Sequence, residues 1–116
     1  MTPTARTLEK CRRDGYCVDV VERWIPGANI RRDLFGCVDV LCIRKSEPFT
    51  LLGIQATTAG NVSSRVRKIV TECSEAAGLF LLHGELQVWG WRRWPDRVDG
   101  RLWRPRVEHI TADMLE

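Results

Sequence analysis

The sequence predicts an α/β fold in which a mixed central sheet is flanked by helices. Two observations support this prediction. Three apolar runs of strand character follow one another between residues 16 and 57, and a stretch with helical spacing then precedes a further strand. The resulting order, α-β-β-β-α-β, describes a meander of three strands, a helical crossover and a returning strand. A chain of 116 residues is the size of one domain, which we expect to span 1–116.

The first half of the chain is expected to contain one helix and three strands. Pro3 and Thr4 suit the start of a helix over 3–14. The turn residues at 14–15 are expected to end this helix. Residues 16–24 alternate as in a half-buried strand, and residues 26–29 break the chain. Residues 35–43 are almost continuously apolar, as in a strand covered on both faces. The break at 44–48 indicates a hairpin connection to a strand over 49–57.

The second half is expected to contain a helix and two strands. After a loop at 58–61, the apolar residues of 62–77 fall on one side at helical spacing and predict a helix. Residues 85–92 predict a fourth strand, and Pro95 to Gly100 a polar turn. Residues 101–110 suit a fifth strand, in which Pro105 marks an edge or irregular position.

Composition excludes several classes of protein. Hydrophobic residues make up 44% and charged residues 28%, which is typical of a globular chain and not of a disordered one. No apolar run approaches the ~18 residues of a membrane span, and the first ten residues lack the apolar core of a signal peptide. The five cysteines include no C-x-x-C pair, which favours reduced thiols over a zinc site. We therefore expect a soluble cytoplasmic protein without a membrane partner.

Two polar residues interrupt the apolar strands. Asp39 lies within the run 35–43, where a carboxylate is costly unless it is paired or binds a cation. Gln55 lies within the run 49–57. If these runs pair as a hairpin centred near residue 46 or 47, Asp39 lies opposite residues 53–55. We therefore expect Asp39 and Gln55 to converge on one face of the sheet.

These segments resemble the PD-(D/E)XK nuclease superfamily, and within it the small resolvase-like members. The segment 36–41 resembles that family's Asp element, and the segment 52–57 lies where its Glu-x-Lys element is expected. Residues 9–16 resemble its first-helix Glu and the following strand start. The resemblance covers roughly residues 5–92. It implies a restriction-endonuclease-like α-β-β-β-α-β core and catalytic roles for Glu9, Asp39 and Gln55.

The sequence departs from this family at two positions. Gln55 stands where the family has a metal-binding Glu, and it keeps a carbonyl oxygen for Mg²⁺ without the charge. Thr57 stands where the family has its catalytic Lys. In this family the Lys can move to the neighbouring helix, which makes Lys68 a candidate; the alternative is a solvated Lys on an amphipathic helix. The resemblance implies that Asp39 and Gln55, with Glu9 through water, hold Mg²⁺ or Mn²⁺.

Basic, hydroxyl and aromatic residues form candidate contacts to DNA. Paired arginines, a helix start and an Arg-interleaved Trp strand suit phosphate and base contacts, and they contribute Arg31, Arg32, Ser63, Arg65, Trp91 and Arg92. Surface ion pairs and core tryptophans are the alternatives. Asp33 either adds a carboxylate to the site or pairs with an arginine. Glu22 either faces the site or is an exposed strand end.

The sequence thus leaves three functions open. The first is a small Mg²⁺-dependent DNA endonuclease, for which the resemblance implies a resolvase-like activity and a phage or mobile-element origin. We expect a homodimer if it cuts both strands of duplex or branched DNA. The second is an inactive nucleic-acid-binding protein on the same fold. The third is a partner-binding protein that uses the Trp-rich strand as its interface.

Overall fold

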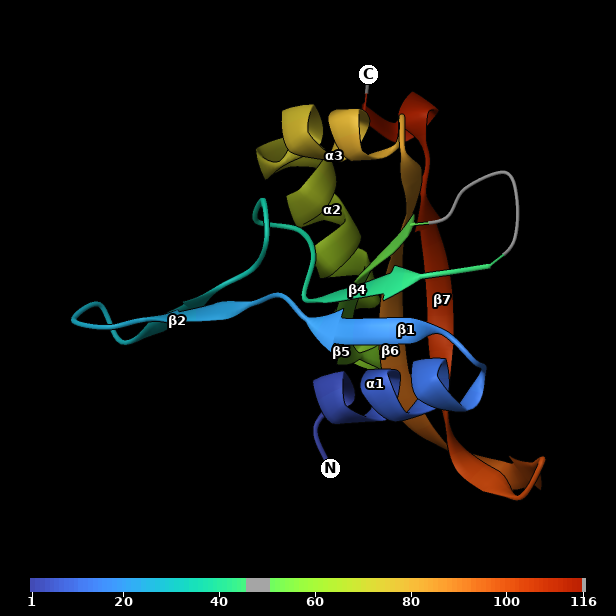
Figure 1. The fold of residues 1–116 in the computed structure, drawn as a ribbon. Helices are drawn as coiled ribbons and strands as arrows, with labels where there is room; N and C mark the ends of the chain where they lie inside the picture. Colours follow the sequence, from blue (N-terminus) through green and yellow to red (C-terminus); the bar gives the residue numbers. More distant parts are fainter. Residues whose placement is uncertain (46–50, 116) are drawn as a thin grey trace.

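A computed structural model, which describes residues 1–45 and 51–115, contains a five-stranded mixed sheet flanked by helices (Figure 1). The sheet has the order β1-β4-β5-β6-β7. Its strands are β1 (Cys17–Val20), β4 (Val40–Ile43), β5 (Leu51–Thr58), β6 (Gly84–Val98) and β7 (Arg101–Ile110). β5 and β6 are parallel, and the other neighbours are antiparallel. The predicted α/β class and mixed sheet are confirmed.

Helices cover both faces of this sheet. They are α1 (Pro3–Arg13), α2 (Val62–Glu72) and α3 (Ser74–Phe80), with the 3-10 helices η1 (Ala59–Asn61) and η2 (Ala112–Leu115). On the face that α1 covers, Cys11 packs with Trp89 and Trp91. On the opposite face, Ile69 of α2 and Ala77 of α3 pack with strand residues of β6. The α2–α3 pair forms the crossover between the parallel strands β5 and β6 (Figure 1).

The strand predicted over 16–24 is divided in the structure. β1 ends at Val20, and β2 (Arg23–Ile25) pairs instead with β3 (Ile30–Arg32). These two strands form a separate two-stranded sheet, the β2–β3 ribbon, which projects away from the main sheet (Figure 1). The chain turns between them at the predicted break 26–29, which includes Gly27 at φ 87°.

The strand predicted over 35–43 is shorter than expected. Leu34 and Val38 exchange backbone hydrogen bonds of 2.9 and 3.0 Å, which closes residues 34–38 into a turn. Phe35 and Gly36 have φ values of 57° and 76° within it, a conformation that glycine adopts without strain. Asp39 therefore directly precedes β4 and does not lie in the middle of a strand.

The C-terminal half follows the predicted order with different boundaries. The helix predicted over 62–77 divides at Cys73 into α2 and α3 and extends to Phe80. The polar turn expected from Pro95 to Gly100 is largely strand, because β6 continues to Val98 in a long hairpin with β7. The fifth strand over 101–110 is confirmed, and it lies at a sheet edge as Pro105 indicated. Residues 46–50 hold part of the predicted connection 44–48 and the start of the predicted strand 49–57, and they lie outside the described residues.

The described residues bear on two further expectations, which concern membrane-spanning segments and the cysteines. None of the described helices has the length and apolar character needed to cross a membrane. All five cysteines are free thiols, and Cys11, Cys37 and Cys42 are buried. They act as small apolar side chains of the core.

Gly90 determines how closely the crossover approaches the sheet. It lies on β6 opposite Thr57, and a Cβ there would collide with Val62 Cγ2 and lie 2.8 Å from Ala59 Cα. Because Ala59 belongs to the backbone leading into α2, it cannot move aside like a side-chain tip. We expect Gly90→Ala to lower the free energy of unfolding in urea by about 3 kcal/mol. Gly60→Ala is the control, since its Cβ meets nothing within 4 Å; equal losses in both variants would contradict this account.

Candidate functional site

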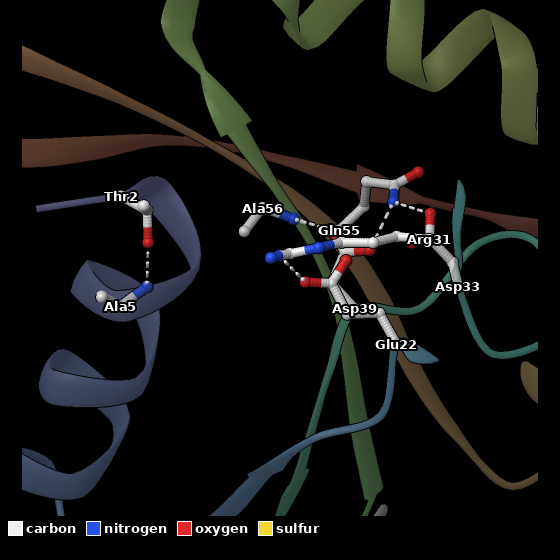
Figure 2. A network of polar contacts seen from close by, with 8 residues as sticks. All are labelled: Thr2, Ala5, Glu22, Arg31, Asp33, Asp39, Gln55 and Ala56. Atoms are coloured by element: carbon white, nitrogen blue, oxygen red, sulfur yellow. Dashed lines mark hydrogen bonds and ion pairs between the residues drawn. The ribbon is translucent and has the colours of Figure 1, made fainter. Parts of the chain in front are cut away.

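Three carboxylates from separate segments meet beside β5. Oxygens of Glu22, Asp33 and Asp39 all lie within 4.8 Å of one another, and we call these three residues the carboxylate cluster. Glu22 lies between β1 and β2, Asp33 directly after β3, and Asp39 directly before β4. Figure 2 shows the three side chains pointing toward one another. Such a concentration of acidic groups is costly unless protons, hydrogen bonds or a cation balance the charge.

Backbone hydrogen bonds fix the position of Asp39. Its N–H donates to the carbonyl of Ile54 at 3.0 Å, and its carbonyl accepts from Val21 N–H at 2.8 Å. Its side chain is held as well, because Ala56 N–H donates to Asp39 Oδ2 at 2.9 Å (Figure 2). Asp39 is thus clamped between the end of β1 and the C-terminal half of β5, and is only 5% exposed.

The turn over residues 34–38 brings Asp33 to Asp39. Leu34 and Val38 form an antiparallel bridge, so the residues that flank it face each other. The Cys73 thiol supports this turn by donating to the carbonyl of Gly36 at 3.4 Å. A hydrogen-bonded turn therefore gathers two acidic side chains that the sequence separates by an apolar stretch.

Gln55 lies against both Asp33 and Asp39, and the predicted hairpin register accounts for its place beside Asp39. The pairing of Val40 with Ile54 places Asp39 next to Gln55. Gln55 Nε2 donates to Asp33 Oδ2 at 2.7 Å and to Asp39 Oδ1 at 3.1 Å (Figure 2). Gln55 is completely buried, and its Oε1 has no hydrogen-bond partner among the described residues. A half-turn of this amide would direct a carbonyl oxygen at the carboxylate cluster, where it suits a hard cation.

Asp33 and Asp39 respond to this environment in opposite directions. Burial, the hydrogen bond shared with Asp33 and the Asp33 charge raise the pKa of Asp39 to about 7. Burial also acts to raise the pKa of Asp33, but hydrogen bonds from Asp39 and Gln55, with the charges of Lys68 and Arg65, hold it below its ordinary value. The two carboxyl groups titrate as a coupled pair, in which Asp39 binds a proton more tightly than Asp33 does.

This proton makes the stability of the metal-free protein depend on pH. Asp39 binds its proton more tightly in the folded protein than in the unfolded chain, so its contribution to stability is full below about pH 4 and is lost as the pH rises through about 7. We expect the free energy of unfolding in EDTA to fall by about 2 kcal/mol between pH 5.5 and pH 8. Urea titrations at the two pH values measure this change. Stability that rises over this interval would contradict the assignment.

Two cationic residues of α2 lie near the carboxylate cluster. Gln55 shares its face of β5 with Gly53, which stands against Phe80 and so faces the α2–α3 layer. On that side, the charges of Arg65 and Lys68 lower the pKa of Asp33. Lys68 is solvent-exposed, and the predicted phosphate contact Ser63 is exposed in the first turn of α2. Positive charge is thus available on the same side of the sheet as the carboxylates.

Glu9 is not among the carboxylates that meet at this site. It lies on α1, which covers the sheet face opposite the α2–α3 layer. Its side chain is 59% exposed and lies 3.6 Å from the Arg13 guanidinium. It lines a cavity of about 150 Å³ together with Trp91 and Trp103. Glu22 and Asp33 supply the additional carboxylates instead.

The predicted DNA contacts differ in their accessibility. Arg31 and Arg32 are exposed on β3, and Arg31 lies 3.2 Å from Glu22 Oε1 (Figure 2). Arg92 is exposed and its guanidinium stacks 4.4 Å from the Trp94 ring centroid. Trp91 is only 5% exposed and donates its indole N–H to Thr7 Oγ1 at 2.9 Å. Its ring belongs to the core beneath α1, so we do not assign it a base contact.

The sequence contains a feature that predicts the proximity of Glu22 and Asp33. The break at 26–29 forms a hairpin in which Arg23 pairs with Arg32, and Glu22 and Asp33 are the next residues outward on each side. Equal distance from a turn places two residues opposite each other in such a ribbon. This symmetry of the sequence about the break at 26–29 distinguishes the site roles of Glu22 and Asp33 from the surface roles that each residue also allows.

In comparisons with models of protein families, with curated proteins and with solved structures, nothing matches this chain. The function must therefore be argued from the chemistry of the site itself. That chemistry combines three carboxylates, one buried amide and two cationic side chains within one region of the sheet.

Proposed function

We propose that this protein is a small metal-dependent DNA endonuclease. The observation that carries the proposal is the convergence of Glu22, Asp33 and Asp39 with the buried amide of Gln55. Carboxylate and amide oxygens are the ligands that Mg²⁺ and Mn²⁺ prefer in proteins. The Oε1 of Gln55, which has no hydrogen-bond partner among the described residues, is a further oxygen that can serve as a metal ligand. These oxygens suit a divalent cation, and a buried side-chain oxygen without a partner is uncommon in a purely structural network.

The residues divide into holding and assisting roles. Asp39, Asp33 and Glu22 would hold the cation, and Gln55 would contribute its carbonyl oxygen after the amide rotates. A bound Mg²⁺ or Mn²⁺ would supply polarisation of a phosphodiester and a lowered pKa of bound water. Lys68, exposed on α2, orients the attacking water or balances the negative charge that develops on the phosphate. The positions of these groups favour hydrolysis of a phosphodiester bond.

The order of the elements also supports this proposal. Without the β2–β3 ribbon and β7, the chain runs α1, β1, β4, β5, α2–α3 and β6, which is the α-β-β-β-α-β order of the resolvase-like nucleases that the sequence resembles. Asp39 directly precedes the second of these strands, and Gln55 lies in the third. Both positions correspond to the acidic elements of that family.

An inactive nucleic-acid-binding protein is the second candidate, and Thr57 is the observation that favours it. Thr57 takes the place of the family's Lys and is only 5% exposed, so no cation comes from that position. In this alternative, the carboxylate cluster with its cation receives a phosphate without cutting it. A partner-binding role for the Trp-rich strand has less support, because Trp89 and Trp91 are buried in the core.

The decisive experiment is a cleavage assay on labelled duplex, branched and single-stranded DNA. We expect the wild-type protein to cut in Mg²⁺ or Mn²⁺ and not in Ca²⁺ or EDTA. Binding that weakens steeply between 50 and 200 mM salt, without cutting in any metal, would establish the inactive alternative. Absence of both cutting and salt-sensitive binding would leave only the partner-binding class. Sedimentation of the protein with and without DNA tests the proposed homodimer.

A further inference from the structure

The β2–β3 ribbon exposes a large aromatic side chain that the core does not use. Trp24 is 54% exposed on β2, and Ile30 is 53% exposed on β3. Among the described residues, the two strands of the ribbon pair with each other and with no other strand, and the ribbon projects away from the main sheet (Figure 1). A two-stranded ribbon has little stability of its own, and exposed aromatic residues on it mark an interaction surface.

Two residues of the carboxylate cluster flank this ribbon, because Glu22 directly precedes β2 and Asp33 directly follows β3. Trp24 pairs with Arg31, so the two side chains share one face of the ribbon. The Arg31 guanidinium contacts Glu22 Oε1 at 3.2 Å, which identifies that face as the one that carries the carboxylates (Figure 2). Trp24 is two residues beyond Glu22 in the chain, which separates their backbones by at most about 7 Å. Its backbone therefore lies close to the candidate metal centre, and its side chain is on the ribbon face that carries Arg31.

The charge of the ribbon indicates what it contacts. Residues 23–32 contain three arginines and no acidic residue. Arginine side chains grip phosphates, and an exposed indole ring stacks on nucleobases. The combination beside a phosphodiester-binding site favours a nucleic-acid strand as the occupant. A base inside an intact duplex is covered on both faces by its neighbours, so only an unpaired base can use such a ring.

We propose that Trp24 is a stacking platform for an unpaired nucleobase adjacent to the phosphate held at the carboxylate cluster. Arg32, on the opposite face of the ribbon, and Arg31 contact the backbone of the same strand. This inference rests on the proposed function and specifies its substrate class: DNA with unpaired nucleotides, whether single-stranded or at a branch, rather than continuous duplex.

Binding measurements with Trp24→Ala and Ile30→Ala test this inference. Ile30 is the matched control, because it is equally exposed on the same ribbon but lies on the face opposite Trp24. The probes are a fluorescein-labelled 12-nucleotide single strand and the corresponding duplex, in Ca²⁺ so that binding is measured without cutting. We expect Trp24→Ala to weaken single-strand binding about 5- to 100-fold and duplex binding less than twofold. Ile30→Ala is expected to change neither by more than about twofold, and Trp24→Phe to retain most of the affinity.

The results separate this inference from the proposed function. Suppose that the wild-type protein binds DNA without cutting it, and that Trp24→Ala selectively weakens single-strand binding. The stacking platform is then supported and the nuclease proposal is wrong. If the wild-type protein cuts DNA and Trp24→Ala binds the single strand normally, the stacking platform is wrong and the nuclease proposal stands. The stacking platform would also be wrong if Trp24→Ala and Ile30→Ala lost the same affinity for the single strand, or if Trp24→Ala lost the same affinity for both probes. Since both side chains are exposed, circular dichroism melting curves are expected to match wild type.

Discussion

Asp39→Asn is expected to abolish DNA cleavage and, at the same time, to stabilise the metal-free protein. The substitution removes a carboxylate from the proposed cation ligands, and we expect cleavage in Mg²⁺ to fall about 1,000-fold or more. It also removes the cost of ionising a side chain whose pKa burial and Asp33 raise to about 7. At pH 8 in EDTA we therefore expect the free energy of unfolding to rise by about 2 kcal/mol.

The new amide fits the hydrogen bonds that Asp39 makes. Its oxygen can accept from Ala56 N–H, and its N–H groups can donate to Asp33 and, once the Gln55 amide rotates, to the Gln55 Oε1, which has no partner among the described residues. The opposite signs of the two effects distinguish a functional carboxylate from a structural one, whose loss would reduce stability. Cleavage gels and urea titrations measure the two quantities. Asp19→Asn, which alters an exposed aspartate of β1, is the control and is expected to change neither.

Two results would count against this account of Asp39. Retained cleavage by Asp39→Asn would remove Asp39 from the metal ligands. A loss of stability in EDTA would mean that Asp39 acts as a structural hydrogen-bond acceptor. Mg²⁺ provides a further comparison, because it is expected to raise the melting temperature of the wild type but not of this variant.

The sequence predicts the pairing of Asp39 with Gln55 because that pairing depends on local periodicity alone. In a hairpin, the numbers of two paired residues add up to a constant, so the turn position determines which residues lie opposite each other. Asp39 and Gln55 are easily recognised as candidates because each is a polar residue within an apolar run. The register of Val40 with Ile54 agrees with this relation. The α/β class follows for the same reason, since apolar spacing distinguishes helices from strands within short windows.

The remaining site residues depend on features that local periodicity does not contain. Glu22 reaches the carboxylate cluster only because the chain leaves the sheet after Val20 and begins a second ribbon. Asp33 reaches it through a turn whose shape depends on the positive φ of Gly36. Glu9 lies apart because α1 packs on the other face of the sheet. The sequence of an amphipathic helix shows which of its sides is apolar, but not which sheet face covers that side.

Gln55→Glu is expected to exchange stability for cation affinity. In the metal-free protein, the change removes the two hydrogen bonds that Nε2 donates to Asp33 and Asp39. It also adds a carboxylate at a completely buried position beside three others. We expect the free energy of unfolding in EDTA at pH 8 to fall by about 3–5 kcal/mol. In Mg²⁺ the added charge becomes a ligand, and we expect the cation to bind about tenfold or more tightly.

The gap between the melting temperatures in EDTA and in Mg²⁺ measures this exchange, and calorimetric titration with Mn²⁺ gives the affinity directly. Gln87→Glu is the matched control: Gln87 is buried on β6, where its Oε1 accepts from Trp89 Nε1 at 2.8 Å, and it is not part of the carboxylate cluster. That variant also introduces a buried carboxylate, so it is expected to lose stability without gaining a response to Mg²⁺. Similar behaviour of the two variants in Mg²⁺ would show that the carboxylate cluster does not bind a cation. A recovery of stability in Mg²⁺ by Gln55→Glu alone would place a cation beside residue 55, because only a bound cation changes a buried carboxylate there from a destabilising group into a ligand.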